Sequence, residues 1–186
     1  MNIKTVKQEP GNVAAPVVIE QVFAEKPGGG MVAGQAFEVK QGTAVYQKAD
    51  SNLFVPIKAY KLAAAATSED TTIKIEKGSG VATGDIVATG KKGVACTAVD
   101  NSNDAYDVVT VTLGVALSKG ATLYQAKSAS ASSAAPVGTP VYVVGNDVPA
   151  NCGDQPVRLI NGANLRKETA PVAAEVVALI PTINLV

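Results

Sequence analysis

The fold is decided by residues 58–127, which read KAYKLAAAATSEDTTIKIEKGSGVATGDIVATGKKGVACTAVDNSNDAYDVVTVTLGVALSKGATLYQAK. Short runs rich in Val, Ile, Thr and Tyr alternate there with clusters of Gly, Asp, Asn and Ser, a pattern typical of strands joined by turns. The close spacing indicates a sandwich or a small barrel rather than strands that alternate with helices. The sequence therefore predicts a mainly β protein with a sandwich- or barrel-like central domain at residues 57–127.

Two phrases inside this stretch echo each other. Residues 81–87 read VATGDIV and residues 117–123 read LSKGATL, so each places a glycine, Gly84 or Gly120, between an apolar residue and a new strand. Glycine allows a positive-φ turn that other residues resist, and the next strand then starts with its side chains correctly faced. The echo indicates two similar halves around one core, although seven residues are few for an internal repeat.

The regions on either side of the central domain are expected to be β segments. Residues 1–56 predict an arm, with a short strand at 17–23 and a flexible glycine break at 27–30, followed by a hairpin of residues 35–39 and 43–47. Polar residues, Pro and Gly around one apolar island indicate that residues 1–30 are poorly ordered alone and become ordered on docking to another protein. Residues 128–135 contain only Ser and Ala, which is typical of a linker or an extended connection.

The C-terminal region, residues 128–186, combines strands with one short helix. Strand-like runs occur at 141–144 and 157–160, and Asn161-Gly162 predicts a tight turn. Thr169 as a cap, with a proline near the first turn, favours a helix from about Pro171 to Ile180. The alternating apolar tail is too apolar to be free, so we expect it to be buried in an interface with a neighbouring subunit or against its own chain, through Ile183, Leu185 and Val186.

Composition excludes several classes of function. The 16 basic residues equal the 16 acidic ones, so no excess charge would attract nucleic acid or an anionic membrane. The chain has no histidine, which removes the commonest general base and metal ligand. We therefore do not expect an enzyme, and we assign no catalytic, cofactor-binding or metal-binding residue. An enzyme would have to use carboxylates such as those of Asp85, Asp104 or Asp107.

Two other oxygen-rich features have simple structural interpretations. The loop at residues 100–104 reads DNSND and could hold Ca²⁺, but a solvated hairpin loop is preferred because the glycine of an EF-hand loop is missing. Asp85 directly follows Gly84, and its carboxylate is expected to bind local backbone amides.

The cysteines and the N-terminus bear on the compartment. Cys96 lies in an alternating apolar run and is expected to pack as a small hydrophobe, whereas Cys152 is expected in a loop. Their separation fits no metal-ligand spacing, and reduced thiols are the default. Residues 1–10 lack the apolar core of a secretory signal, and no run approaches the length of a membrane span, so we expect a protein that is made and used without crossing a membrane.

Several strings in the chain resemble the head fibre proteins of tailed bacteriophages, notably phages of gut Bacteroidales and the crAss-like phages among them. In the central stretch these strings are AYKL (59–62), DTTIKI (70–75), GDIV (84–87), TAVD (97–100), YDVVTV (106–111) and LYQA (123–126). Near the C-terminus they are RLINGANLRKE (158–168) and PTINLV (181–186). The resemblance covers about two thirds of the chain. One departure is Ala121 after Gly120, where a second Gly-Asp would be expected.

The resemblance implies a virion structural protein on the capsid exterior, made in the host cytoplasm, fixed to the major capsid protein and assembled as a trimer. Residues 1–30 would then dock on the capsid, and the C-terminal tail would lie in the trimer interface. It supplies no catalytic residues, and the chain has no heptad run for a long helical stalk. The alternative is a module that binds host-surface glycans. Its available stacking residues would be the five tyrosines, although strand tyrosines more often belong to cores or interfaces: Tyr46, Tyr60, Tyr106, Tyr124 and Tyr142.

Overall fold

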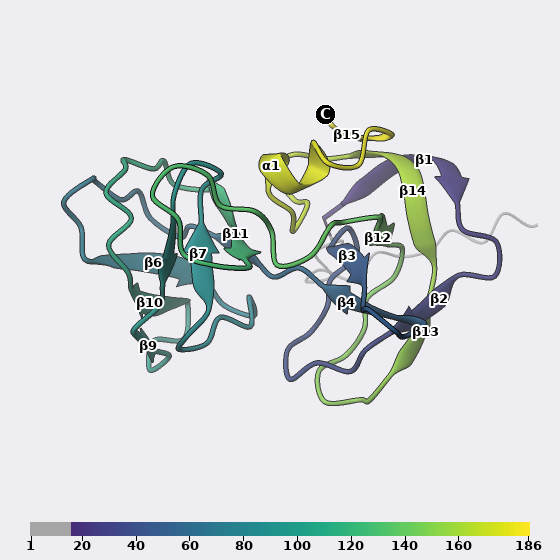
Figure 1. Cartoon of the computed structure of the whole chain (residues 1–186), viewed down its shortest axis with the longest axis horizontal. Coiled ribbons are helices and arrows are strands. Elements are labelled where there is room, and N and C mark those ends of the chain that lie inside the picture. Colours follow the sequence, from purple (N-terminus) through teal and green to yellow (C-terminus); the bar gives the residue numbers. More distant parts are fainter. Residues whose placement is uncertain (1–15) are drawn as a thin grey trace, which may run out of the picture.

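The computed structural model describes residues 16–186, which form two β units that lie side by side (Figure 1). The central unit comprises residues 57–137. The flanking unit comprises residues 16–56 and 138–186, so the chain leaves this unit once, builds the central unit and returns. The prediction of a mainly β fold with one short C-terminal helix is confirmed.

One sheet of eight strands forms the flanking unit. Seven of its strands run in the order β1-β14-β12-β3-β4-β2-β13, and β15 pairs in parallel with β14. Their bounds are β1 (Ile19–Glu25), β2 (Gly30–Val32), β3 (Ala44–Gln47), β4 (Leu53–Pro56), β12 (Tyr142–Val144), β13 (Gln155–Val157), β14 (Leu159–Leu165) and β15 (Ile183–Leu185).

This sheet curls until its two ends meet. Only Arg158 separates β13 from β14, while β13 pairs with β2 and β14 pairs with β1. The strand path therefore returns on itself, and the curved sheet encloses an apolar interior. This interior is made of Val32, Val39, Val45, Phe54, Val144, Val148, Val157 and Leu159.

Two small sheets form the central unit. One has the order β5-β11-β7-β8 and the other has the order β6-β10-β9. Their bounds are β5 (Ala59–Lys61), β6 (Thr72–Glu76), β7 (Ile86–Ala88), β8 (Gly93–Ala95), β9 (Ala98–Asp100), β10 (Tyr106–Thr110) and β11 (Thr122–Ala126). Their shared core contains Tyr60, Leu62, Ala66, Ile73, Ile75, Val87, Cys96, Val109, Val111, Leu113 and Leu123.

The central unit consists of two halves with matching backbone hydrogen bonds. Gly84 and Gly120 have φ of 92° and 81°, as the two echoing phrases predict, and each glycine opens the turn before a strand, β7 or β11. In each half the glycine N–H donates to a carbonyl of the other half. Two further backbone N–H groups in each half donate to carbonyls at equivalent positions. The matched pairs are Gly84 to Cys96 with Gly120 to Leu62, Cys96 to Asp85 with Leu62 to Ala121, and Thr97 to Thr110 with Ala63 to Lys74.

The pairing between the halves is also symmetric. Ile73 faces Val109 across β6 and β10, and Ala88 faces Tyr124 across β7 and β11. Each pair joins positions that are equivalent in the two halves, as expected around a two-fold axis. The interpretation of residues 81–87 and 117–123 as parts of two similar halves is therefore confirmed by the backbone pairing.

An apolar cluster joins the two units. It includes Ala88, Tyr124, Ala126 and Ala134 of the central unit together with residues of the sheet, the helix α1 (Ala174–Val177) and β15 of the flanking unit. At the same junction, a Cβ on Gly90 would lie 2.8 Å from the Glu175 side chain. Close packing of this kind resists movement of one unit against the other.

The structure corrects the predicted hairpin and the predicted tight turn. Residues 35–39 form only an isolated bridge, from Val39 to Val148, because β3 pairs with β4 and β12 instead. Asn161 and Gly162 lie inside β14 rather than in a turn. A Cβ on Gly162 would lie 3.1 Å from the Cβ of Ala24, so this glycine lets β1 approach closely.

The N-terminal arm is also corrected in part. Residues 1–15 of the predicted arm lie outside the described residues. The expected strand at 17–23 is present as β1, but it is paired with β14 along its length, so it is already ordered in the single chain. The expected glycine break is a defined turn, since Gly29 N donates to Lys26 O at 3.0 Å.

The predicted helix is much longer than the observed one. α1 covers four residues, and its N-cap, Ala173, is extended and has no side-chain cap. The Thr169 hydroxyl donates instead to Val17 O at 2.5 Å. Val172 and Ala173 are buried in the apolar cluster, which favours the extended backbone that precedes the helix.

The tail is buried in part against its own chain. Ile183 is 4 % exposed within the apolar cluster, whereas Leu185 is half-buried and Val186 is 53 % exposed. Residues 128–135 also pack, since Ser130 pairs with Gly93 and Ala134 is buried. The serine–alanine segment is therefore an ordered connection that belongs to the central unit.

Candidate functional site

The Asp85 carboxylate joins strands of the central unit. Its Oδ2 accepts hydrogen bonds from Lys58 Nζ at 2.8 Å, Tyr60 OH at 3.0 Å and Ala82 N at 2.9 Å. Its Oδ1 accepts one from Gln125 Nε2 at 3.2 Å. The expectation that Asp85 binds a local backbone amide is confirmed, but the ion pair with Lys58 was not foreseen from the sequence, since 27 positions separate the partners.

This cluster is largely shielded from water. The side chains of Lys58 and Asp85 are 16 % and 12 % exposed, and Tyr60 is fully buried. Burial, followed by the charge of Asp85, raises the pKa of Tyr60 far above its ordinary range. Tyr60 is therefore a neutral donor, and Asp85 is a fully bonded acceptor rather than a free base.

The other candidate carboxylates do not join Asp85 in one site. Asp107 on β10 pairs with Lys77 at 2.6 Å and is buried. Asp104 is exposed in the loop between β9 and β10. Because each acid has separate surroundings, the described residues bring together no pair of carboxylates from the three named candidates for general acid and base work.

The loop at residues 100–104 is a hairpin turn held by its own side chains, as preferred from the sequence. Asp100 Oδ1 accepts from Ser102 N at 3.0 Å, and Asn103 Oδ1 accepts from Ala105 N at 2.9 Å. The first of these bonds lowers the pKa of Asp100. Within residues 16–186 no group of three or more His, Cys, Asp or Glu residues is placed to hold a metal ion.

The tyrosines do not form a stacking platform. Tyr60 and Tyr124 are buried, and the Tyr124 hydroxyl donates to Ala134 O at 2.5 Å. The other three are half-buried, with Tyr106 beneath the Lys74 ammonium at 4.7 Å from the ring centre. Tyr142 packs edge-on against Phe54 in the flanking unit. The tyrosine rings therefore pack in separate parts of the protein and do not share one surface.

The cysteines lie where the sequence predicts. Cys96 is buried in the central core, and Cys152 is half-buried in the loop before β13. Both are free thiols. Burial raises the pKa of the Cys96 thiol, which favours its role as a small hydrophobe.

A groove of about 370 Å³ lies between the two units. Its central-unit wall comes from β5 and the turn after β6, and its flanking-unit wall comes from residues 37–43 and 169–171. Lys58 of the Asp85 cluster lines this groove, and its Nζ lies 5.7 Å from the ring centre of Phe37. No residue pattern in the sequence indicated this groove, because it forms only where the units meet.

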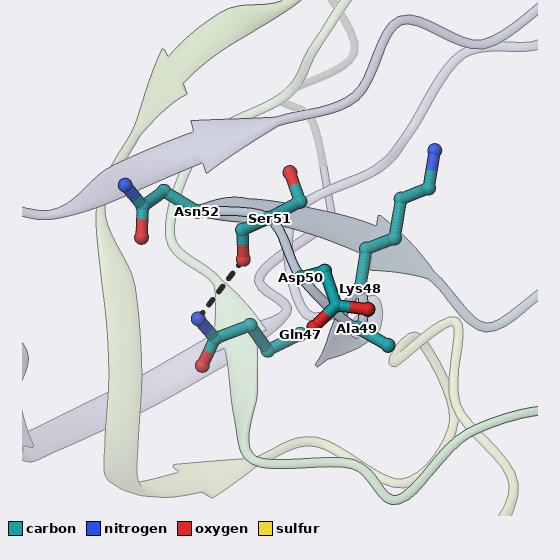
Figure 2. A pocket seen from close by; sticks show the side chains of 6 residues that line it. All are labelled: Gln47, Lys48, Ala49, Asp50, Ser51 and Asn52. Atoms are coloured by element: carbon teal, nitrogen blue, oxygen red, sulfur yellow. Dashed lines mark hydrogen bonds between the residues drawn. The ribbon is translucent and has the colours of Figure 1, made fainter.

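A second hollow belongs to one hairpin alone. It is formed by the turn between β3 and β4, where Gln47 Nε2 donates to Ser51 O at 3.1 Å (Figure 2). Asp50 occupies the tip with a positive φ of 55°. The hollow draws no side chain from another element, and its lining is Gln47, Lys48, Ala49, Asp50, Ser51 and Asn52.

Comparisons of the chain with protein-family models, with curated proteins and with solved structures find no match. In residues 16–186 no helix is long and apolar enough to cross a membrane. The resemblance to head fibre proteins therefore rests on the quoted strings, and the function follows as a proposal from those strings and from the surface of the fold.

Proposed function

We propose that the chain is a structural protein of a phage virion, which attaches to the major capsid protein on the outside of the capsid and assembles as a homotrimer. The resemblance of its central and C-terminal strings to head fibre proteins supports this role. The balanced charge and the separate surroundings of the candidate carboxylates favour a structural role over catalysis.

The observation that carries the proposal is the exposure of β1. Six of its seven residues are exposed, and the apolar side chains of Val22 and Phe23 are 38 % and 55 % exposed. Among the described strands β1 pairs only with β14, so its other edge offers backbone donors and acceptors to a partner. An apolar strand edge of this kind is suited to contact with another protein.

Binding to capsids tests the proposal. Purified full chain is added to particles of the encoding phage that lack this protein, and bound protein is located by immunogold electron microscopy. We expect label over the capsid surface. The double variant Val22→Ser/Phe23→Ser should lose most of the label, whereas Val141→Ser, which alters an equally exposed valine, should retain it.

Light scattering of the purified chain tests the trimer separately. Label absent from capsids would contradict the virion role, and a monomeric mass would contradict the trimer. Equal labelling by the double variant would show that β1 is not the attachment surface.

A further inference from the structure

The groove between the units is rigid and partly lined by side chains fixed in place. Both walls belong to units that share the apolar cluster around Tyr124 and α1, so the groove does not require a large rearrangement to form. Ligand sites favour such junctions, and a volume of about 370 Å³ is within their usual range. Preorganised walls reduce the entropy lost on binding.

Because the central unit is duplicated, Asp85 can be compared with the residue at the equivalent position of the other half. Asp85 is equivalent to Ala121 in the other half, yet both halves form the same turn and the same backbone hydrogen bonds. The turn therefore does not depend on the carboxylate. Asp85 occurs in the half whose Lys58 faces the groove, where it fixes the position of that ammonium group.

Two polar groups of the groove are available to a ligand. The Lys58 ammonium uses one of its three N–H groups for Asp85. Thr43 is 5 % exposed, and its hydroxyl makes no hydrogen bond to another described residue. Thr43 is among the residues that line the groove.

The groove carries no excess positive charge, because its lysines are paired with carboxylates and its lining also includes Asp147. Its four lysines each lie within 4 Å of an acidic side chain, so the walls offer directed donors and acceptors rather than a net field. A polyanion would gain little from such walls, whereas hydroxyl groups can both donate to carboxylates and accept from ammonium groups. The pairs are Lys40–Glu38, Lys58–Asp85, Lys61–Glu76 and Lys77–Asp107.

The groove also has an apolar surface. Phe37 is half-buried and is held against Gly80, where a Cβ would lie 2.4 Å from the ring. Pro171 lines the same flanking-unit wall as Phe37. Together with the balanced polar groups, this surface suits a ligand that has both hydroxyl groups and an apolar C–H face.

We propose that the groove between the two units binds a short neutral oligosaccharide, with Phe37 against a sugar face and with Thr43 and Lys58 bonded to its hydroxyl groups. This inference goes beyond capsid attachment and uses a different surface from β1. It also differs from a tyrosine-based platform, because none of the five tyrosines lines the groove.

An oligosaccharide array tests the ligand class. The full chain, fluorescently labelled, is applied to neutral oligosaccharides, to sialylated and sulfated oligosaccharides, and to proline-containing peptides. We expect binding to members of the neutral set. Absence of binding to every neutral member, or binding only to the acidic sugars or peptides, would overturn the proposal.

Matched variants test the location. The neutral oligosaccharide that binds best on the array is titrated into each variant and followed by NMR. Thr43→Val keeps the side-chain volume and should weaken binding about tenfold, because it removes one hydroxyl partner. Thr72→Val, on the exposed face of β6, should bind like the parent. Equal affinity of Thr43→Val and the parent would overturn the assignment to this groove.

Discussion

At the scale of single residues, Asp85 is the most connected polar side chain of the central unit. It accepts from groups on β5 and β11 and from the turn that precedes β7, while its exposure is low. A buried ion pair costs desolvation, but removal of one partner leaves the other charge without compensation. The cluster therefore stabilises the contact of β5 and β11 with the turn before β7, although the equivalent turn in the other half forms without a carboxylate.

Asp85→Ala should lower the free energy of unfolding by about 1–3 kcal/mol, because it leaves Lys58, Tyr60 and Gln125 without their shared acceptor. Urea unfolding of the purified chain measures this loss. Glu38→Ala, which breaks an exposed pair with Lys40, should change the free energy by no more than about 1 kcal/mol. Equal effects of the two substitutions would contradict a buried role for Asp85.

Alkaline pH should destabilise the protein through three groups. Burial, as the leading cause, raises the folded-state pKa of Tyr60, Tyr124 and Cys96. The folded chain thus holds protons that the unfolded chain releases, and this stability is complete below the unfolded values of 9.0 for cysteine and 10.0 for tyrosine. It is lost progressively as the pH rises above them.

The measurement is urea unfolding between pH 7 and pH 11. Tyr60 alone should contribute a slope of up to about 1.4 kcal/mol per pH unit above pH 10. Tyr60→Phe should flatten that slope, whereas Tyr106→Phe leaves Tyr60 intact and should keep it. A free energy of unfolding that stays constant to pH 11 would contradict the prediction.

At the scale of elements, the turn between β1 and β2 shows why a glycine is needed. Gly28 and Gly29 both have positive φ, of 76° and 65°. A Cβ on Gly29 would lie 2.3 Å from Val157 O, whereas one on Gly28 would meet nothing within 4 Å. Both positions require a positive φ, and they differ only in the space available for a Cβ atom.

Gly28→Ala should therefore cost about 1–2 kcal/mol of stability, from the left-handed backbone alone. Gly29→Ala should cost clearly more, because β13 must also move away. Chemical denaturation of both variants checks the order, and a Gly28→Ala variant that is less stable than Gly29→Ala would refute the role of Val157.

The C-terminal strand β15 offers a second test at this scale. Deletion of residues 182–186 removes Ile183 from the apolar cluster and should lower stability by about 1.5–3 kcal/mol for that side chain. The solution mass should remain that of an assembly of unchanged copy number, because Ile183 is buried against its own chain. Light scattering alongside thermal unfolding checks both points, and a fall in copy number would support the prediction that the tail lies in a subunit interface.

At the scale of the whole molecule, local patterns predicted strands but not which strands meet. The runs at 72–75 and 106–111 have the composition of buried strands. The positive φ of Gly84 and Gly120 was predicted from their position between an apolar residue and a new strand. The curl of the large sheet could not be predicted, because it depends on the pairing of β1 with β14 and of β2 with β13, more than 120 positions away. Asn161-Gly162 was misinterpreted for the same reason: its glycine serves a distant strand, and local sequence favours a turn.

The candidate site shows the same limit. The carboxylate of Asp85 could be placed in a turn from Gly84 alone, but Lys58, Gln125 and the groove required the tertiary fold. Thr43 and Phe37 carry no sequence motif that marks them. Their roles follow from the meeting of two units that are interleaved along the chain.

The shared apolar cluster predicts that the two units unfold together. Tyr124 is 2 % exposed at the junction, where residues of the central unit pack with α1 and β15. If one unit opened, it would expose the packed surface of the other, so calorimetry should give one transition whose calorimetric and van't Hoff enthalpies agree. Tyr124→Ala opens a cavity at this junction, costs about 3–5 kcal/mol and should weaken the coupling, which broadens or splits the transition. Val141→Ala, at an exposed position, should keep the single transition, and two separate transitions in the parent chain would show that the units are energetically independent.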